Sequence, residues 1–487
     1  MKEVTHSFLQ THVSFRPARR CYAIMAAMRP TYDALLVALL LIARVRIDTL
    51  AEAAVLPLRF QDVANHPVLG RLLAPPVWQT FGDRYVDGLS LILIATAFAA
   101  LALYLLADGL RARLGSRRAW WVKVILLAVI IGATVVAPTI KLILLRQTSG
   151  PASYSHDGGV IQTEATIDFL RAGKNPYIED YTQTPMAAWG FDEYRTALYH
   201  YPYLPWTFVF SAPLQAASRT LLGWYDQRLV YLLLYLMMLC LVAGLARRTG
   251  EAGSPALALM ALLGLNPIMA NDVIFGQNDV FVLFWIVLSL WLLARPRPRV
   301  WLSAFVFGLA CASKPTAWFF APFYAWLLLS AAPVGPPRTI PGTLTTLVRS
   351  GWPALVSFLL LMTPYVLWDA NALVDDVWRW ANGTAAQAYQ IWGWGASNVV
   401  LALQWVSSRF AYWPFWVPQL LISLPLLVWL MRWQARDNTL AGAAWRYGFF
   451  LFVFLFVSRF MNENYLGYVL ALWALGYFVA EKETFLV

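Results

Sequence analysis

Apolar segments long enough to cross a lipid bilayer recur along this chain of 487 residues. A helix needs about 20 mainly apolar residues to span a hydrocarbon core ~30 Å thick. The pattern therefore predicts an all-α, polytopic transmembrane protein with about 11–13 membrane helices. The expected spans are 32–54, 87–108, 119–145, 203–222, 227–246, 255–271, 279–294, 300–331, 347–367, 413–432, 444–459 and 464–480. We expect 300–331 to break into two shorter helices at Lys314-Pro315, because proline interrupts a helix.

The composition excludes a large soluble fold. Only 13% of the residues are charged and 60% are hydrophobic, whereas soluble domains carry roughly 25% charged residues. The net charge of +11 comes from basic residues that lie mainly in short loops between spans. That distribution is typical of cytoplasmic loops, so we expect membrane lipids and no nucleic acid as partners. Three scattered cysteines form neither a disulfide framework nor a metal-ligand spacing, and we expect no metal and no cofactor.

Two long segments, 146–202 and 368–412, lie outside the expected spans. The first contains an amphipathic pattern over 160–170, which predicts an interfacial helix. The second contains Trp392-Gly393-Trp394-Gly395, whose aromatic rings suit either interfacial anchoring or a wall that stacks on sugars. Residues 1–30 are polar and basic and are expected to form a disordered cytoplasmic tail without a cleavable signal peptide. Residues 31–487 are expected to form a single membrane domain.

Three polar clusters are expected at one membrane face. With the N-terminus inside, the span 119–145 delivers Asp157 to the outer face. Placing the basic loops Arg295–Arg299 and Arg432–Arg436 inside puts Gly276–Asp279 and Arg459–Asn464 outside. The polar clusters therefore converge on the outer face.

One basic pair conflicts with this topology. Arg247-Arg248 lies inside only if the segment 203–222 does not fully cross the membrane. Pro202, Pro205 and Pro213 make a bent or re-entrant helix plausible there. The sequence alone leaves both topologies open.

Several polar residues in these clusters invite a functional interpretation. Asp157 follows a span directly, and it suits chemistry at the bilayer surface or, alternatively, a helix cap. Lys314 lies in an apolar stretch, where a charge is costly and points to function, although snorkelling to the interface is an alternative. Gln277, Asn278 and Asp279 suit substrate binding or capping of the next helix. Arg459 and Glu463, four residues apart, also suit a structural helix pair.

Seven short segments follow one another along the chain. In order they are Ser155-His156-Asp157-Gly158, Leu170–Tyr177, Tyr201–Pro205, Asn266-Pro267, Gly276–Asp279, Gly308-Leu309-Ala310 and Lys314-Pro315. Their order resembles the GT-C superfamily of integral membrane glycosyltransferases. It looks closest to the bacterial mannosyltransferase-like members of glycosyltransferase family 87. The resemblance covers about residues 150–330 well and 440–480 loosely.

The resemblance implies an enzyme of the bacterial plasma membrane with its active site on the outer face. Such an enzyme transfers a sugar, mannose by family default, from a polyprenyl-phosphate donor to a hydroxyl of a lipid or glycan acceptor, with inversion. Asp157 would be the general base. A phosphate leaving group needs no strong acid, so one carboxylate suffices. Many relatives carry two acidic residues one apart in this loop, sometimes with a metal, whereas two glycines follow Asp157 here, which argues against a metal-bound pair.

Further site residues are expected in two groups. Cations are needed for the donor phosphate, and the candidates are Lys314, Arg171, Lys174 and Arg459. Polar and aromatic side chains are expected to bind the substrate, and the candidates are Tyr177, Tyr201, Gln277, Asn278, Asp279, Asn462 and Glu463.

Two alternative functions remain open from the sequence. A transporter or flippase of lipid-linked sugars would place polar residues near mid-bilayer on several spans, whereas the polar clusters here lie at span ends. A polysaccharide polymerase or ligase would use arginines of the outer loops, for which Arg171 and Arg195 are available.

Overall fold

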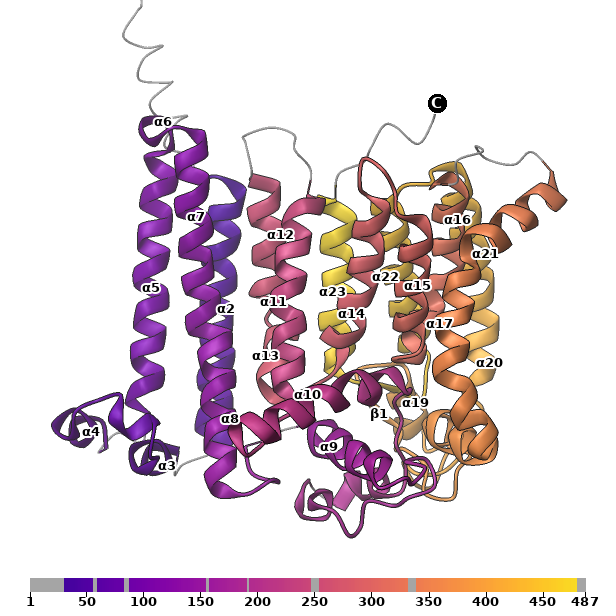
Figure 1. Ribbon diagram of the computed structural model, residues 1–487, viewed down its shortest axis with the longest axis horizontal. Helices are drawn as coiled ribbons and strands as arrows, with labels where there is room; N and C mark the ends of the chain where they lie inside the picture. Colours follow the sequence, from indigo (N-terminus) through magenta and orange to yellow (C-terminus); the bar gives the residue numbers. More distant parts are fainter. Residues whose placement is uncertain are drawn as a thin grey trace, which may run out of the picture.

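The computed structural model describes residues 30–55, 59–82, 87–154, 157–190, 192–246, 254–331 and 339–479. Regular structure in these residues is almost entirely helical, which confirms the all-α prediction. Most of the long helices run side by side as one bundle (Figure 1). Most of the expected tail and the pair Arg247-Arg248 lie outside the described residues.

The N-terminal part of the bundle is built on three long helical runs. These are α2 (Tyr32–Val55), α5 (Gly88–Gly109) and a run in which α7 (Ser116–Ile131) continues into α8 (Ala137–Ser149) through a π-helical turn. The fully buried Arg44 donates a hydrogen bond of 2.8 Å to the carbonyl of Thr134 within that turn. A charge at this depth is tolerated because backbone carbonyls solvate it.

The C-terminal part holds the remaining helices of the bundle. They are α11 (Arg228–Leu245), α12 (Ser254–Gly264), α13 (Met269–Phe275), α14 (Asp279–Leu293), α15 (Val300–Cys311), α16 (Ala321–Ala331), α17 (Ile340–Val374), α21 (Leu424–Arg436), α22 (Leu440–Phe456) and α23 (Glu463–Phe478). The break expected at Lys314-Pro315 is confirmed, since α15 ends at Cys311 and a 3₁₀ turn starts at Pro315. A second break, at Asn266-Pro267, bends α12 against α13 by 45°.

Several apolar helices make this an integral membrane protein. In the described residues, five helical runs are long and apolar enough to cross a membrane, and the bent pair α12–α13 makes a sixth. The runs are Gly88–Gly109, Ser116–Ser149, Arg228–Leu245, Pro341–Asn382 and Trp416–Arg436. This count is below the eleven to thirteen expected from hydropathy, because other expected spans form shorter apolar helices such as Asp279–Leu293 and Val300–Cys311.

The segment 203–222 does not run parallel to the bundle. Its helix α10 (Trp206–Leu222) lies obliquely along the lower edge in Figure 1. Leu221 near its end is 81% exposed, and Gly223 ends the helix in the left-handed conformation that glycine adopts without strain. The chain then enters α11 from the same edge. The geometry favours the non-crossing alternative left open by the sequence.

The two long connecting segments gather at this same edge, which we call the cavity end. The helix expected over 160–170 forms as α9 (Gly158–Arg171) there, and the short α3 (Arg59–Asn65) and α4 (Pro75–Gly82) lie farther along the same edge, below α5 (Figure 1). The second segment contains α18 (Trp380–Asn382), β1 (Trp392–Gly393) and α19 (Ser397–Ala402), and α20 (Trp416–Pro418) follows it. Strand β1 pairs in parallel with β2 (Phe460–Met461), which joins this segment to the α22–α23 connection. The basic helix α6 (Arg111–Leu114) lies at the opposite end.

The orientation of α10 can be tested by thiol labelling. After replacement of the three native cysteines, single cysteines at Lys174, Leu221 and Arg297 are compared in intact cells. We expect Lys174→Cys and Leu221→Cys to react with an impermeant reagent from the same side, because α10 starts and ends at the cavity end. Arg297→Cys should react only after the membrane is opened. Labelling of Leu221→Cys together with Arg297→Cys would mean that α10 crosses.

Candidate active site

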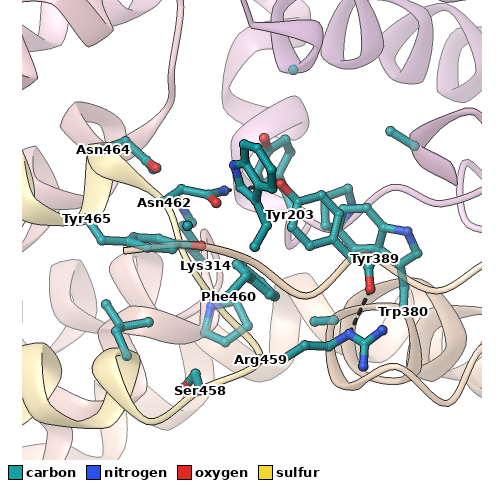
Figure 2. A pocket seen from close by; sticks show the side chains of 18 of the residues that line it. Tyr203, Lys314, Trp380, Tyr389, Ser458, Arg459, Phe460, Asn462, Asn464 and Tyr465 are labelled. Atoms are coloured by element: carbon teal, nitrogen blue, oxygen red, sulfur yellow. Dashed lines mark hydrogen bonds between the residues drawn. The ribbon is translucent and has the colours of Figure 1, made fainter. Parts of the chain in front are cut away.

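A cavity of about 1310 Å³ opens at the cavity end of the bundle. Its wall is made by helix ends and connecting segments rather than by the middle of the bundle. The contributing stretches are 152–203, 277–278, 314–319, 377–419 and 454–465. In Figure 2, Asn462 and Tyr465 lie on one side of Lys314, and Tyr389 and Trp380 lie on the other. The cavity therefore brings together the three polar clusters predicted from the sequence.

A buried cluster of four charges lies beneath the first polar segment. Arg146 of α8 donates to both oxygens of Glu164 of α9, at 2.8 and 2.7 Å, and to Asp226 at 2.9 Å. Asp226 in turn accepts two hydrogen bonds from Arg228 of α11, at 2.9 and 2.7 Å. Two cations and two anions compensate one another, as buried charges must. The cluster joins three helices of different sequence position.

The same arginines hold the backbone that precedes Asp157. Arg146 donates to the carbonyl of Pro151 at 2.7 Å, and Arg228 donates to that of Tyr154 at 2.7 Å. Tyr154 has a φ of 56°, a conformation that costs free energy in a non-glycine residue and needs such support. The amide of Asp157 then donates to the carbonyl of Phe275 at 3.3 Å. The position of Asp157 is thereby fixed relative to α13.

Asp157 begins α9 and borders the cavity. Its carboxylate accepts a hydrogen bond of 2.6 Å from the amide of Gly159, so the capping alternative also holds. Burial raises the pKa of Asp157 to about 6, although the Gly159 amide and the charge of Lys314 oppose that shift. A carboxyl group with this pKa is largely ionised at neutral pH and is more basic than an ordinary aspartate.

The glycines after Asp157 have a steric cause. A methyl group at Gly159 would lie 2.6 Å from Asp157 Oδ1 and 2.9 Å from the hydroxyl of Tyr203. A methyl group at Gly158 would lie 2.7 Å from the ring of Trp189. Both contacts are shorter than real side chains make. The aromatic side chains of Trp189 and Tyr203 thus occupy the space in which side chains at positions 158 and 159 would lie.

Lys314 reaches the cavity as part of a buried polar network. Its ammonium donates to Asp279 at 2.8 Å and to Asn278 at 3.2 Å. Asp279 also accepts a hydrogen bond from Asn464 of α23, and the ammonium lies 5.1 Å from the ring centre of Tyr465. An ammonium has three donors, and within the described ranges two of them are used by Asn278 and Asp279, which leaves one for a group in the cavity. The network links α14, α23 and the break after α15.

Arg459 borders the cavity, but its guanidinium donates hydrogen bonds to backbone carbonyls of the segment 389–411. It donates to Tyr389 at 2.7 Å and to Ala411 at 3.0 Å, and more weakly to Arg409 and Phe410. The first of these bonds is drawn in Figure 2. Burial lowers the pKa of Arg459 to about 10, which leaves it protonated at neutral pH. Its observed contacts are those of an anchor for the segment 389–411.

Two oxygens in the cavity wall are suited to accept hydrogen bonds from hydroxyl groups of a ligand. In the part of the chain that the structure describes, Gln277 Oε1 and Asn462 Oδ1 are buried and have no hydrogen-bond partner. A buried acceptor without a partner is costly, so a polar ligand is the natural means of satisfying both. Glu463, also in the wall, is exposed.

Asp279 contacts Lys314 but does not itself line the cavity, and four further predicted site residues lie away from it. Arg171 is exposed at the end of α9, and Lys174 pairs at its surface with Glu179 at 2.8 Å. Tyr177 and Tyr201 are buried beneath the wall; Tyr177 donates to the carbonyl of Tyr203. Tertiary packing therefore separates these four residues from Asp157 and Lys314.

Aromatic residues complete the wall, among them Trp392 and Trp394, for which the sequence left open either interfacial anchoring or sugar stacking. They are Trp189, Tyr203, Trp380, Tyr389, Trp392, Trp394 and Tyr465. Gly393 explains the placement of its neighbours: a methyl group there would lie 2.1 Å from the carbonyl of Met461. The glycine lets β1 approach β2, and both tryptophans of the Trp-Gly repeat border the cavity. The alternation of tryptophan with glycine over residues 392–395 is the sequence pattern that indicated this part of the wall.

His200 clamps the two long segments together. Its Nδ1 lies 2.9 Å from Asp376, whose other oxygen accepts from the amide of Tyr201 at 2.9 Å. With Asp375, these side chains offer three potential metal-ligand atoms within 4.8 Å of one another. The hydrogen bonds account for the arrangement without a metal.

Comparison with known proteins gives one match. Residues 168–330, a third of the chain, match the family described as alpha-(1->6)-mannopyranosyltransferase, N-terminal domain. The matched region contains Gln277, Asn278, Asp279 and Lys314 and begins shortly after Asp157. Searches among curated proteins and among solved structures gave no significant match. The similarity supports a mannosyltransferase-like membrane glycosyltransferase.

The Lys314–Asp279 pair should contribute to stability independently of any substrate. Lys314→Met leaves Asp279 buried without its cation, and breaking such a pair costs about 3–5 kcal/mol. We expect a clearly lower melting temperature in detergent. The double variant Lys314→Met/Asp279→Asn should recover part of the loss, because the uncompensated charge is gone. Unchanged melting of the single variant would show that the pair is not structural.

Proposed function

We propose that this membrane glycosyltransferase transfers a sugar, mannose in the first instance, from a polyprenyl-phosphate donor to an acceptor hydroxyl at the outer membrane face. Asp157 is the general base, and the transfer inverts the anomeric configuration. The observation that carries the proposal is the position of Asp157: a carboxylate with a raised pKa of about 6 borders a large cavity beside Tyr203 and within the electrostatic reach of Lys314.

The reaction needs one proton transfer and one displacement. Asp157 removes the proton of the acceptor hydroxyl as that oxygen attacks the anomeric carbon of the donor. The bond between the anomeric carbon and the phosphate oxygen breaks, and its electron pair leaves with the phosphate. Attack opposite the leaving group inverts the configuration. The side-chain oxygens of Gln277 and Asn462, which have no hydrogen-bond partner within the described residues, would accept hydrogen bonds from hydroxyl groups of the sugar.

The leaving phosphate requires a cation rather than an acid. Lys314 is the strongest candidate, because it borders the cavity and has a donor to spare after contacting Asn278 and Asp279. Preorganised donors of this kind stabilise developing charge effectively. Arg459 would add positive potential, although its hydrogen bonds go to the backbone. Arg171 and Lys174 would act, if at all, from outside the cavity wall.

The lipid chain of the donor has an apolar path beside the cavity. Phe319, Phe454, Leu455 and Trp416, at the start of α20, line the cavity, and the ring centres of Phe319 and Phe454 lie 4.4 Å apart. The helical run from Trp416 to Arg436 exposes most of its apolar side chains, including Leu420 and Leu421. Exposed apolar surface of this kind faces lipid. A lipid-borne donor could therefore reach the cavity from the bilayer.

The geometry favours the proposed sugar transfer from a lipid phosphate over the two alternative functions. A transporter would place its site near the bilayer midplane between bundle helices, whereas this cavity is lined by helix ends and connecting segments. A polymerase or ligase that relies on outer-loop arginines loses support as well. Arg171 is exposed away from the cavity, and Arg195 donates to the carbonyl of Ala187.

Asp157→Asn tests the assignment of the base. The amide keeps the shape of the side chain but cannot accept the proton, so transfer should fall by about 10²–10⁴-fold, the range for loss of a general base. Donor lipid should still bind. Turnover is measured with purified protein and a series of polyprenyl-phosphate sugars. A variant with near-normal turnover would remove Asp157 from the mechanism.

The pH dependence offers a second test. The base is active only when ionised, so the rate should rise with pH and reach half its maximum near the pKa of about 6. Below that pH the carboxyl is protonated and the rate should fall about tenfold per pH unit. The profile of kcat/KM is the relevant measurement, because it reports the free enzyme. The range from pH 5 to pH 7 extends about one unit to either side of the pKa of Asp157. A rate that does not change over this range would therefore exclude Asp157 as the base.

A further inference from the structure

A second cavity of about 420 Å³ borders α9 through residues other than those that line the cavity beside Asp157, which we call the transfer cavity. Its volume falls within the ~300–1,000 Å³ range of small-molecule sites. Asp157, Gly159 and Gln162 of the α9 segment border the transfer cavity, whereas Glu164 and Asp168 border the second one. The helix therefore borders two cavities at the same end of the molecule.

Two ion pairs line the second cavity. The inner pair, Arg146 with Glu164, is largely buried and belongs to the four-charge cluster. The outer pair joins Arg219 of α10 to Asp168 through two hydrogen bonds of 2.6 and 2.9 Å. Its side chains are 41% and 47% exposed. The four charges sum to zero, so the cavity has no excess charge to attract a metal ion or a phosphate.

The remaining lining is of mixed polarity. Gln147 and Gln183 contribute amides, and Trp224 contributes a partly exposed aromatic ring. A carboxylate that is paired with arginine still has lone pairs that can accept further hydrogen bonds. Hydrogen bonds from hydroxyl groups to a carboxylate are strong because the acceptor is charged. Amides both donate and accept. A ligand that matches this lining carries many neutral hydroxyl groups and apolar C–H faces.

We propose that the second cavity binds a neutral saccharide separately from the transfer reaction. Asp168 and Arg219 hold hydroxyl groups at its rim, and Trp224 packs against a sugar face. Since its floor is the cluster that holds Pro151 and Tyr154, an occupied cavity would also stiffen the support of Asp157. The proposal concerns binding and stands whether or not Asp157 is the base.

Calorimetry with the purified full-length protein tests the proposal, with maltotriose and α-mannotriose as probes and inorganic phosphate as the charged competitor. We expect saturable binding of at least one trisaccharide. Asp168→Asn should weaken it by about tenfold or more, the effect of losing a hydrogen bond to a charged group. Glu179→Gln is the matched control, because it makes the same change in the comparable surface pair Lys174–Glu179, which lies outside the second cavity. Melting temperatures of both variants verify folding.

The outcomes separate cleanly. Weaker binding in Asp168→Asn, supported by Trp224→Ala and absent in Glu179→Gln, supports the site. No trisaccharide binding to the parent protein overturns it, as does phosphate binding in its place. Equal binding by the parent and Asp168→Asn also overturns it and assigns the saccharide to another cavity. No donor lipid is present, so failure of the transfer reaction leaves this measurement unaffected.

Discussion

The compensation of four buried charges is the interaction on which the cavity end depends. Arg146, Glu164, Asp226 and Arg228 come from α8, α9 and the start of α11, and each is paired with an opposite charge of the cluster and makes further hydrogen bonds to the backbone. Their desolvation is costly, so the cluster persists only with all partners in place. Helices that otherwise contact one another through apolar side chains are thereby held in one register.

The cavity combines this rigid support with a second, smaller network. Lys314, Asp279 and Asn464 connect the break after α15 to α14 and α23, while Arg459 secures the aromatic segment through its carbonyls. Both networks use polar residues at the ends of apolar helices, where water and lipid meet. A site at the ends of apolar helices thus obtains its polar side chains as compensated pairs, which avoids the cost of an unpaired charge in hydrocarbon.

Much of the candidate site could be predicted because certain residues are costly where they occur. Asp157 after a span, Lys314 in an apolar stretch, and the cluster from Gln277 to Asp279 are unusual on chemical grounds, and all lie at or beside the cavity. Tyr203 and Tyr465 were missed because aromatic residues are common throughout this chain. Arg171 and Lys174 belong to the same polar segment, but the direction of α9 carries them to the surface.

The sequence by itself determined the class of fold and the approximate positions of the helices. Both follow from local properties: a helix needs a certain apolar length to cross a bilayer, and proline interrupts a helix. The sequence also indicated which end of the spans carries the polar residues. Only the tertiary structure decided that α10 lies along the edge, that several expected spans are short or broken, and which side chains share the cavity. Those outcomes depend on contacts between residues far apart in the chain, such as Arg228 with Tyr154 and Lys314 with Asp279, and no local pattern encodes them.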